Sequence, residues 1–497
     1  MASTLEFEPS ARLTLQDEQP AKGNGARPSA GLKLGWLMAS VGFLIGSRPI
    51  GDNSFLTHLA TGRLMVERGA IPKADPYSSL GLGEAWTVQS WLPSLLYATA
   101  ESVLGLWSIA ILHGLIAAAV LGTVWHLTSE AGALLARVGL TSIVAIPATV
   151  TWSSRPFMFG LLAMAIMMAV AKRPATRPTV AIMTIVFGIW INSHGSFVLG
   201  WALLAMMALG AGIDDRRWPR RELTYLVAAI GGVALGAMHP VGARLVWFPV
   251  HMLMRREVLD GVQEWNSPRF GTWQEYVFLL TVVLIVIAAA RGARWRALIP
   301  SVVMSLGGLL AVRNISVACV VVVAINAPSL AGMFNNELGA AGTALSRAVQ
   351  GLAISVLAVS MWSVVSEPAI DLRRYPVEEV DWMLQRQLVA SPDISVGHRE
   401  YVGNYLTYRF GSKARVFVDD RYDFHAISVI KDHKALVEGT GVAEVLDSRE
   451  FDVLVWPSDS HVGELLEYHP GWRIAHSGDH FVVACRTTSP AYHRCEI

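Results

Sequence analysis

Apolar residues along this chain gather in blocks of about 20 residues, the length that crosses the ~30 Å hydrocarbon core of a bilayer as a helix. Polar and charged residues fill the connections between the blocks. The pattern predicts a polytopic α-helical membrane protein with about eleven transmembrane helices. The blocks lie at 34–50, 106–127, 134–151, 157–171, 178–192, 196–213, 223–238, 274–290, 297–312, 314–331 and 346–365.

Two segments in the first long polar connection carry helical patterns of a different kind. Residues 55–68 place apolar side chains along one face, as an amphipathic helix does. Residues 87–105 are only half apolar and include Gln89, Ser90 and Glu101. That composition favours an interfacial or re-entrant helix over a full span.

The same pattern divides the chain into three regions. We expect a disordered cytoplasmic tail at 1–33, a transmembrane domain at 34–365 with a long external loop at 51–105, and a separate C-terminal domain at 366–497. In the last region short apolar runs alternate with helical patterns, which is typical of a small α/β domain. Strands are expected at 394–396, 415–418, 453–456 and 481–484, and helices at 403–410, 427–437 and 462–468.

The distribution of Lys and Arg predicts the orientation in the membrane. Basic residues cluster in alternate connections, at 172–177, 216–221, 291–296 and 347, and in the N-terminal tail. The positive-inside rule then places the N-terminus in the cytoplasm and, with an odd number of spans, the C-terminal domain outside a bacterial inner membrane. The net charge of +1 gives no support to nucleic-acid binding.

The three cysteines fall in two settings. Cys319 lies inside an apolar block and is expected to be a small buried side chain. Cys485 and Cys495 lie close together near the C-terminus. They can form a disulfide if that end faces an oxidising compartment, and free thiols are the equal alternative.

Ionisable and polar side chains gather at the predicted external helix ends. Asp52 follows the first apolar block directly and has two interpretations: a general base, or a cap for the amides of a following helix. Asp75 precedes a proline and fits a turn. The two acids can also share a divalent cation such as Mg²⁺ or Mn²⁺, although no third ligand is identifiable. His58 lies on the same loop.

Further polar residues lie at the other external helix ends. Arg155 and Arg313 suit bidentate binding of a phosphate, or structural pairing with one of the acids. Glu264 fits a second acid or an ion-pair partner. Asn192, His194 and His239 could contact a substrate, although hydrogen-bonded packing is the more frequent role of such a lone histidine.

The C-terminal region contains the acidic run VFVDDRYDF, with Asp419, Asp420, Arg421 and Asp423. A sugar-binding strand end and a solvated turn with an internal arginine pair both fit, and the turn is favoured. The sequence contains no Gly-rich loop with GK[ST], so an ATP-driven pump has no support, and it contains no HExxH or CxxC motif.

The first loop, DNSFLTHLATGRLMVERGAIPKADPYSS followed by WTVQSWL, resembles membrane glycosyltransferases of the GT-C superfamily, and more narrowly a bacterial group within it. The resemblance continues through SRPFMF, WINSHG, HPVG and EWNSP, and ends in YVGNYLTYRFG and VFVDDRYDF, so it covers most of the chain.

The resemblance implies a polyprenyl-phosphate-linked sugar as donor, transfer on the external face, and a base in the first external loop. Asp52 matches that base. Asn53 stands where many members have a second acid, which puts metal dependence in doubt. By the same resemblance Arg155 and Arg313 would hold the donor phosphate, and His58 and Asp75 would position the acceptor or the base.

These observations predict a glycosyltransferase, of the hexosyl or pentosyl type, that serves an extracytoplasmic glycan, lipid or protein acceptor. Two alternatives stay open: a transporter or flippase for a lipid-linked glycan, and a non-catalytic subunit of envelope assembly. A transporter needs polar residues at midspan, whereas the polar residues here cluster at one face of the membrane. That clustering favours the enzyme.

Overall fold

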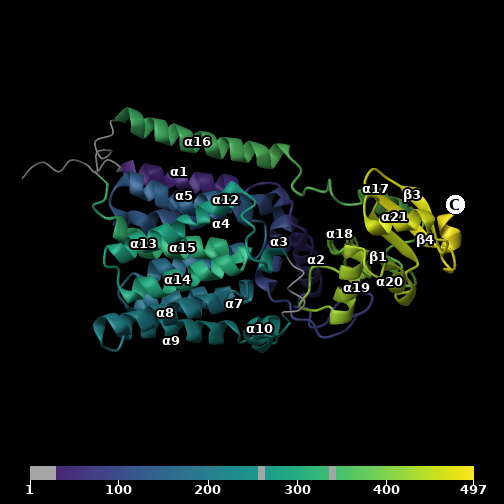
Figure 1. Cartoon of the computed structure of the whole chain (residues 1–497), viewed down its shortest axis with the longest axis horizontal. Helices are drawn as coiled ribbons and strands as arrows, with labels where there is room; N and C mark the ends of the chain where they lie inside the picture. Colours follow the sequence, from purple (N-terminus) through teal and green to yellow (C-terminus); the bar gives the residue numbers. More distant parts are fainter. Residues whose placement is uncertain (1–29, 256–262, 335–342, 497) are drawn as a thin grey trace, which may run out of the picture.

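The computed structural model describes residues 30–255, 263–334 and 343–496 (Figure 1). A body of long helices lying side by side forms one end of the molecule, and a smaller domain with a sheet forms the other. The helices of the body are α1 (Ala30–Gly46), α4 (Trp107–Leu127), α5 (Leu134–Thr151), α6 (Phe157–Ala171), α7 (Arg177–Ser193), α8 (Phe197–Asp215), α9 (Arg220–Gly236), α12 (Trp273–Phe278), α13 (Leu280–Ala290), α14 (Trp295–Leu310), α15 (Ile315–Asn326) and α16 (Thr343–Ser366).

Each predicted apolar block coincides with a helix, although the block at 274–290 is divided between α12 and α13. In the described part of the chain six helical segments are long and apolar enough to cross a membrane, and three further apolar helices are shorter. The molecule is therefore a multi-pass membrane protein with a largely helical fold. The count of eleven spans stays a prediction, and residues 1–29 of the predicted tail lie outside the described residues.

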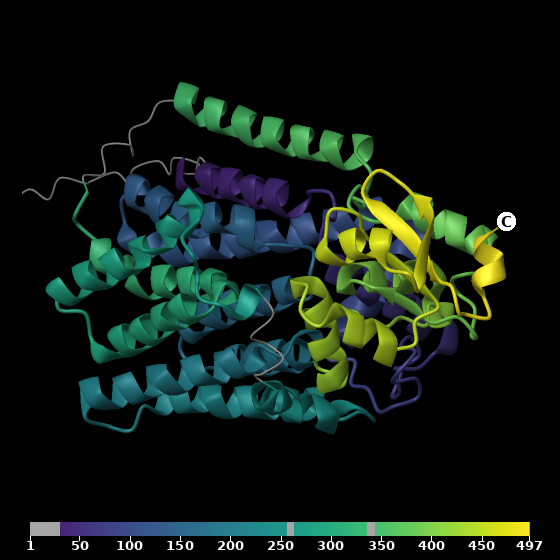
Figure 2. The same ribbon diagram turned by 45° about the vertical axis from the view of Figure 1, so that its right-hand side comes forward.

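The last turn of α1 packs closely against α4. Gly42 and Gly46 form a GxxxG pair facing the backbone of α4. A Cβ atom at Gly46 would lie 2.5 Å from the carbonyl oxygen of His113, so only glycine fits there. The last long helix, α16, lies along α1 in both views (Figure 2).

The chain after α1 is tied to the chain after α16. The backbone N–H of Ile50 donates to Ala369 O at 2.9 Å, and the N–H of Asp371 donates to Ile50 O at 2.9 Å. These two bonds lie two residues before Asp52. The start of the loop at 51–105, which keeps the name external loop from its predicted orientation, is therefore held against the start of the C-terminal region.

The external loop contains the two helices that its pattern predicts, α2 (Asn53–Arg68) and α3 (Trp91–Leu104). Both pack in one hydrophobic core with the C-terminal region. Phe55, Tyr77 and Tyr97 from the loop share this core with Val396 and Val453. A third connection also reaches the C-terminal region, because α10 (Gly242–Met254) is followed by Arg255, which donates to backbone carbonyls of that region.

The C-terminal region is a small α/β domain, as predicted. Its four-stranded sheet has the order β1-β2-β4-β3, with β1 parallel to β2 and the other pairs antiparallel. The strands are β1 (Val396–His398), β2 (Val453–Pro457), β3 (Trp472–Ser477) and β4 (Phe481–Arg486). The helices are α17 (Val377–Gln385), α18 (Glu400–Phe410), α19 (Ile427–Glu438), α20 (Val442–Ser448) and α21 (His461–Tyr468).

The three predicted helices and the strands near 453 and 481 are confirmed, but the strand predicted at 415–418 is wrong. Val416 forms only isolated bridges, to Ser78 of the loop and to Val396 of β1, and its N–H donates to Tyr77 O while its carbonyl accepts from Ser79 N. Its backbone groups are therefore occupied by the external loop, which the local pattern cannot reveal. The pattern also missed β3, α17 and α20, and it placed the first strand two residues early.

The structure decides between the disulfide and the free thiols that the sequence left open for Cys485 and Cys495. Cys485, on β4, is bonded to Cys495 with their Cα atoms 6.5 Å apart. Cys319 is free and buried in α15, as expected.

Candidate functional site

Asp52 carries two contacts at once. It is the N-cap of α2, where its Oδ1 accepts from the backbone N–H of Ser54 at 3.0 Å. Its Oδ2 accepts from Nε of Arg155 at 2.5 Å. The capping interpretation is therefore confirmed, but it occupies only one carboxylate oxygen and leaves the other facing a cation.

Arg155 lies in the turn between α5 and α6 and joins two acids. One edge of its guanidinium pairs with Asp52 and the other pairs with Glu264. Burial alone would lower the pKa of Arg155, but the charges of Asp52 and Glu264 outweigh burial and raise it. The interpretation of Arg155 and Glu264 as ion-pair partners is therefore confirmed.

His58 and Arg313 lie close to this ion-pair cluster. His58 projects from α2, with Nδ1 3.0 Å from Oγ of Ser94. Burial lowers the pKa of His58 to about 4, against the opposing effect of the Asp52 charge, so the ring is neutral at pH 7. Arg313 stacks over Trp265, 4.3 Å from the ring centroid, and forms no ion pair with a described residue.

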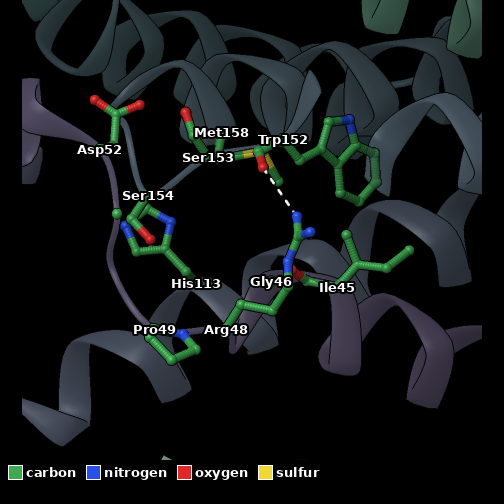
Figure 3. A pocket seen from close by; sticks show the side chains of 11 residues that line it. Ile45, Gly46, Arg48, Pro49, Asp52, His113, Trp152, Ser153, Ser154 and Met158 are labelled. Atoms are coloured by element: carbon green, nitrogen blue, oxygen red, sulfur yellow. Dashed lines mark hydrogen bonds between the residues drawn. The ribbon is translucent and has the colours of Figure 1, made fainter. Parts of the chain in front are cut away.

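A cavity of about 280 Å³ opens beside Asp52 (Figure 3). Arg48 forms part of its wall by donating to main-chain carbonyls of Ile45, Thr149 and Trp152, which joins the ends of α1 and α5. The lining residues are Ile45, Gly46, Arg48, Pro49, Gly51, Asp52, His113, Trp152, Ser153, Ser154 and Met158.

His113 is a lining residue that the sequence pattern missed. It lies on α4 with 1% of its surface exposed, and neither ring nitrogen has a hydrogen-bond partner in the described structure. Its ring packs beside Tyr97 and Phe159. A polar ring without a hydrogen-bond partner in an apolar helix is costly unless it meets a ligand. The presence of a histidine inside the apolar block 106–127 could have identified this residue from the sequence.

A second carboxylate near Asp52 comes from the C-terminal domain. Oδ2 of Asp420 accepts from the hydroxyl of Ser54, the residue whose amide Asp52 caps. The N–H of Asp420 donates to Oδ1 of Asn404 at 3.2 Å, whereas Oδ1 of Asp420 is buried without a partner. Burial, together with the charge of Asp419, raises the pKa of Asp420 to about 6.

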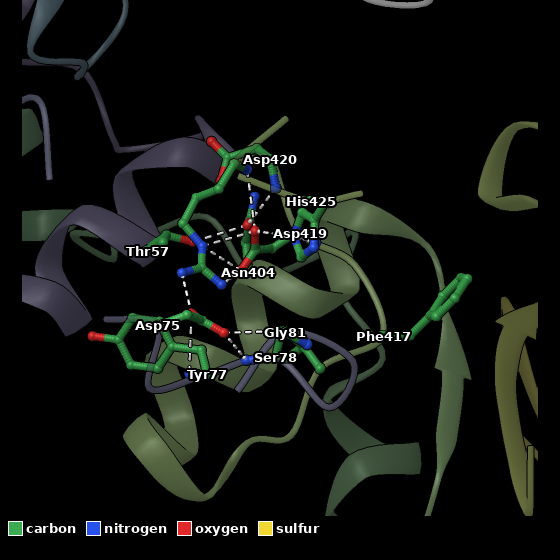
Figure 4. A network of polar contacts seen from close by, with 12 residues as sticks. Thr57, Asp75, Tyr77, Ser78, Gly81, Asn404, Phe417, Asp419, Asp420 and His425 are labelled. Atoms are coloured by element: carbon green, nitrogen blue, oxygen red, sulfur yellow. Dashed lines mark hydrogen bonds and ion pairs between the residues drawn. The ribbon is translucent and has the colours of Figure 1, made fainter. Parts of the chain in front are cut away.

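Asp75 belongs to a different network, shown in Figure 4. Its Oδ1 accepts from Nη1 of Arg421 at 2.5 Å, and Arg421 also pairs with Asp419 at 2.7 Å. Nε2 of His425 lies 2.8 Å from Asp419. Burial alone would raise the pKa of Asp419, but the nearby charges and hydrogen bonds of Arg421 and His425 lower it.

The solvated-turn interpretation of VFVDDRYDF is therefore wrong. The side chains of Asp75 and Asp419 are fully buried and that of Arg421 is 7% exposed. The internal arginine pair was expected, but its second carboxylate, on the external loop, could not be read from the sequence.

Asn192 and His239 form a third cluster. Oδ1 of Asn192 accepts from Nε1 of Trp91 at 2.8 Å and lies 2.8 Å from Nε2 of His239. His194 accepts from the N–H of Ser196 and packs against Phe157. These contacts explain the fold of three helix ends, and a substrate-binding role for the three residues stays a prediction.

The described part of the structure contains no cluster of side chains that could bind a metal ion. Within residues 30–255, 263–334 and 343–496, no group of three or more His, Cys, Asp or Glu side chains is arranged to hold a metal ion. Asp75 is held by Arg421 and Ser78, so it is not free to share a cation with Asp52.

No protein-family model and no curated protein sequence matches the chain. Solved structures do match it. AglB, the archaeal oligosaccharyltransferase of Archaeoglobus fulgidus, solved with an inhibitory peptide and a dolichol-phosphate, aligns with a TM-score of 0.52 and 11% identity, over 86% of this chain and 69% of AglB. ArnT of Cupriavidus metallidurans, solved with undecaprenyl phosphate, aligns with a TM-score of 0.49 and 12% identity, over 92% of this chain and 98% of ArnT.

The helical body, the external loop and the small C-terminal sheet define a multi-pass membrane protein whose polar site lies where these three parts meet. Its fold is similar to that of AglB, in agreement with the helical membrane fold that the sequence resemblance implied.

The Arg421 network predicts a large effect on the docking of the C-terminal domain. Arg421→Gln leaves Asp75 and Asp419 buried without their cation, so the interface should lose about 3–5 kcal/mol. We expect a lower Tm and faster proteolysis of the C-terminal domain in the purified protein. Arg373→Gln, which removes an exposed arginine paired with Asp371, should change neither, and an equal effect of both variants would contradict the argument.

The raised pKa of Asp420 predicts a pH-dependent effect of Asp420→Asn. Because the folded protein holds this proton more tightly than the unfolded chain, the stabilisation is complete below about pH 4 and is lost as the pH rises through about 6. Asn can still accept from Ser54, so the variant should be more stable than wild type by about 2 kcal/mol at about pH 8.

The difference between Asp420→Asn and wild type should vanish near pH 4. Thermal unfolding across this range measures it, with exposed Asp459→Asn as the control. A difference that is constant with pH would show that Asp420 titrates normally.

Proposed function

We propose that the protein is a glycosyltransferase that moves a sugar from a polyprenyl-phosphate donor to an acceptor on the extracytoplasmic side of a bacterial inner membrane. The observation that carries this proposal is the placement of Asp52. Its carboxylate is held by a helix N-terminus and by Arg155, and it borders a cavity at the end of α1. The fold likeness to the oligosaccharyltransferase AglB is consistent with this chemistry, and the contacts of Asp52 support it directly.

Asp52 acts as the general base in this mechanism. It accepts the proton of an acceptor hydroxyl, whose oxygen attacks the anomeric carbon of the donor sugar. The new glycosidic bond forms as the bond between that carbon and the phosphate oxygen breaks. The polyprenyl phosphate leaves with the electron pair and the negative charge, so a single displacement inverts the anomeric centre.

Arg155 and Arg313 are not equally available to bind the donor phosphate. Arg155 is already engaged by two carboxylates, so its main role is to orient Asp52. Arg313 has no described ion-pair partner and interacts electrostatically with Glu264 and Arg155, which places it near the same cluster. A guanidinium in that position can stabilise the charge that grows on the leaving phosphate.

His113 is assigned as a substrate-binding residue. The residue lines the cavity that Asp52 borders, and its buried ring nitrogens have no partner in the described structure, so a shift of the ring toward the cavity would let a ligand hydroxyl or phosphate oxygen satisfy one of them. His58 lies on α2, the helix that Asp52 caps, and positions the acceptor in this scheme.

The alternatives explain the structure less well. A transporter for a lipid-linked glycan requires a polar path through the body, whereas the ion-pair cluster lies just after the ends of α1 and α5 and in the turn at Gln263–Trp265. A non-catalytic assembly subunit has no need for a carboxylate, a buried histidine without a partner and a cavity at one place.

The proposal predicts loss of glycosyl transfer in Asp52→Asn. Asparagine caps a helix as well as aspartate does, so the variant keeps α2 while removing the base. We expect transfer to fall by about 10²–10⁴-fold. The measurement compares envelope glycans by mass spectrometry in a deletion strain that carries wild type or variant at matched membrane levels.

Asp459→Asn serves as the matched control, because it removes an exposed carboxylate of the C-terminal domain. If Asp52→Asn restores the glycan as wild type does, Asp52 is only a cap, and the transporter and assembly alternatives become the better interpretations.

His113→Phe should separate activity from stability. The substitution removes two unsatisfied polar atoms and keeps an aromatic ring beside Tyr97 and Phe159, so Tm should stay equal or rise. The KM for the lipid donor should rise by about tenfold, because one hydrogen bond to the substrate is lost. A fall in Tm with unchanged kinetics would assign His113 a structural role.

A further inference from the structure

A second cavity, of about 650 Å³, lies between the external loop and the C-terminal domain. It lies at the far end of α2 from Asp52, and the 16 residues of that helix separate the two places by about 24 Å at 1.5 Å per residue. The lining residues are Arg68, Ala74, Asp75, Pro76, Leu82, Gly83, Ala390, Pro392, Ser412, Lys413 and Arg415. We call it the Arg415 groove.

Three cations line the Arg415 groove, and none of them forms an ion pair with a described residue. Arg68 is the last residue of α2, and Lys413 and Arg415 follow α18. The lining acid Asp75 is already paired with Arg421, and its oxygens accept from Tyr77 and Ser78 as well. The groove therefore carries an uncompensated positive charge.

Arg415 shows that this charge is held in place. Its Nη1 is buried and has no hydrogen-bond partner in the described structure. Its backbone φ is +49°, in the left-handed region that an arginine rarely adopts. The neighbours on both sides impose this conformation, since the N–H of Val416 donates to Tyr77 O and the N–H of Ala414 donates to Gly411 O.

A buried guanidinium nitrogen without an acceptor is a costly arrangement unless a ligand supplies one. Phosphate and carboxylate groups have the geometry that arginine binds in a bidentate manner. All lining residues come from the external loop and the C-terminal domain, and none comes from a helix of the body. This placement favours a water-soluble ligand over a lipid headgroup.

We propose that the Arg415 groove binds a phosphate or carboxylate group of an anionic glycan, and that this glycan is the acceptor. The second half of this statement rests on the proposed function. A chain extended along α2 can place one anionic group in the groove and a hydroxyl beside Asp52. The groove then selects charged polymeric acceptors and does not take part in the chemical step.

Direct binding to the purified full chain tests the groove without any transfer reaction. The probes are tripolyphosphate and an oligogalacturonate, with a neutral malto-oligosaccharide as the uncharged control. We expect both anionic probes to bind wild type, and the double variant Arg415→Asn with Lys413→Gln to bind them at least about tenfold more weakly. Asparagine tolerates the left-handed backbone, so the variant should keep its fold.

Lys431→Gln is the matched control, because it removes one exposed cation elsewhere in the C-terminal domain and should leave binding unchanged. Lys413→Gln alone should weaken binding by a smaller factor, which guards against a folding defect in the double variant. Equal affinity of wild type and the double variant, or no binding by wild type at low salt, would overturn the proposal.

Two further measurements distinguish a lipid anion from a soluble glycan anion, and distinguish failure of the groove from failure of the proposed function. Binding to nanodiscs of phosphatidylglycerol that depends on Arg415, without binding of the soluble probes, would assign the groove to lipid and overturn the glycan. Asp52→Asn should bind the probes as wild type does. If the wild-type protein binds the probes but shows no transfer activity, the groove is an anion site and the proposed transferase function is wrong. If the double variant transfers sugar with a normal KM for the acceptor, the transferase function stands and the groove is not the acceptor site.

Discussion

The placement of the C-terminal domain depends on one buried cation, Arg421. It joins Asp75 of the external loop to Asp419 of the C-terminal domain, with all three side chains almost completely removed from solvent. Removing three charged groups from water is tolerated only when they meet one another with good geometry. The arrangement therefore permits one docking position of the domain on the loop, and a domain shifted by a few ångströms would leave charges uncompensated.

That docking position completes the polar site beside Asp52. Asp420 follows Asp419 directly, so the Arg421 network brings its carboxylate to Ser54, at the start of α2. Asp52 itself depends on the helical body, where the last turn of α1 packs closely against α4 and the α5–α6 turn supplies Arg155. The site is thus assembled from the body, the loop and the domain, which explains why hydrophobic packing alone could not specify it.

This chain and AglB have similar folds although only 11% of their aligned residues are identical, so the fold does not require these particular side chains. A helical body with an external loop can be retained while nearly every side chain changes. The features that suit chemistry are this chain's own: a carboxylate fixed by an amide and a guanidinium, a buried histidine without a partner in the described structure, and the cavity that both residues line.

The sequence by itself determined the helical body, α2, α3 and most of the C-terminal elements, because hydrophobic periodicity is a local property that each segment carries alone. It also singled out Asp52, Arg155 and Glu264, which the structure joins in one ion-pair cluster. Only the tertiary structure decided that Asp75 meets Arg421, that Asp420 reaches Ser54, and that residue 416 pairs with the loop and forms no strand of the sheet. These contacts join residues hundreds of positions apart, and a buried charge chooses its partner by three-dimensional proximity, which no local pattern records.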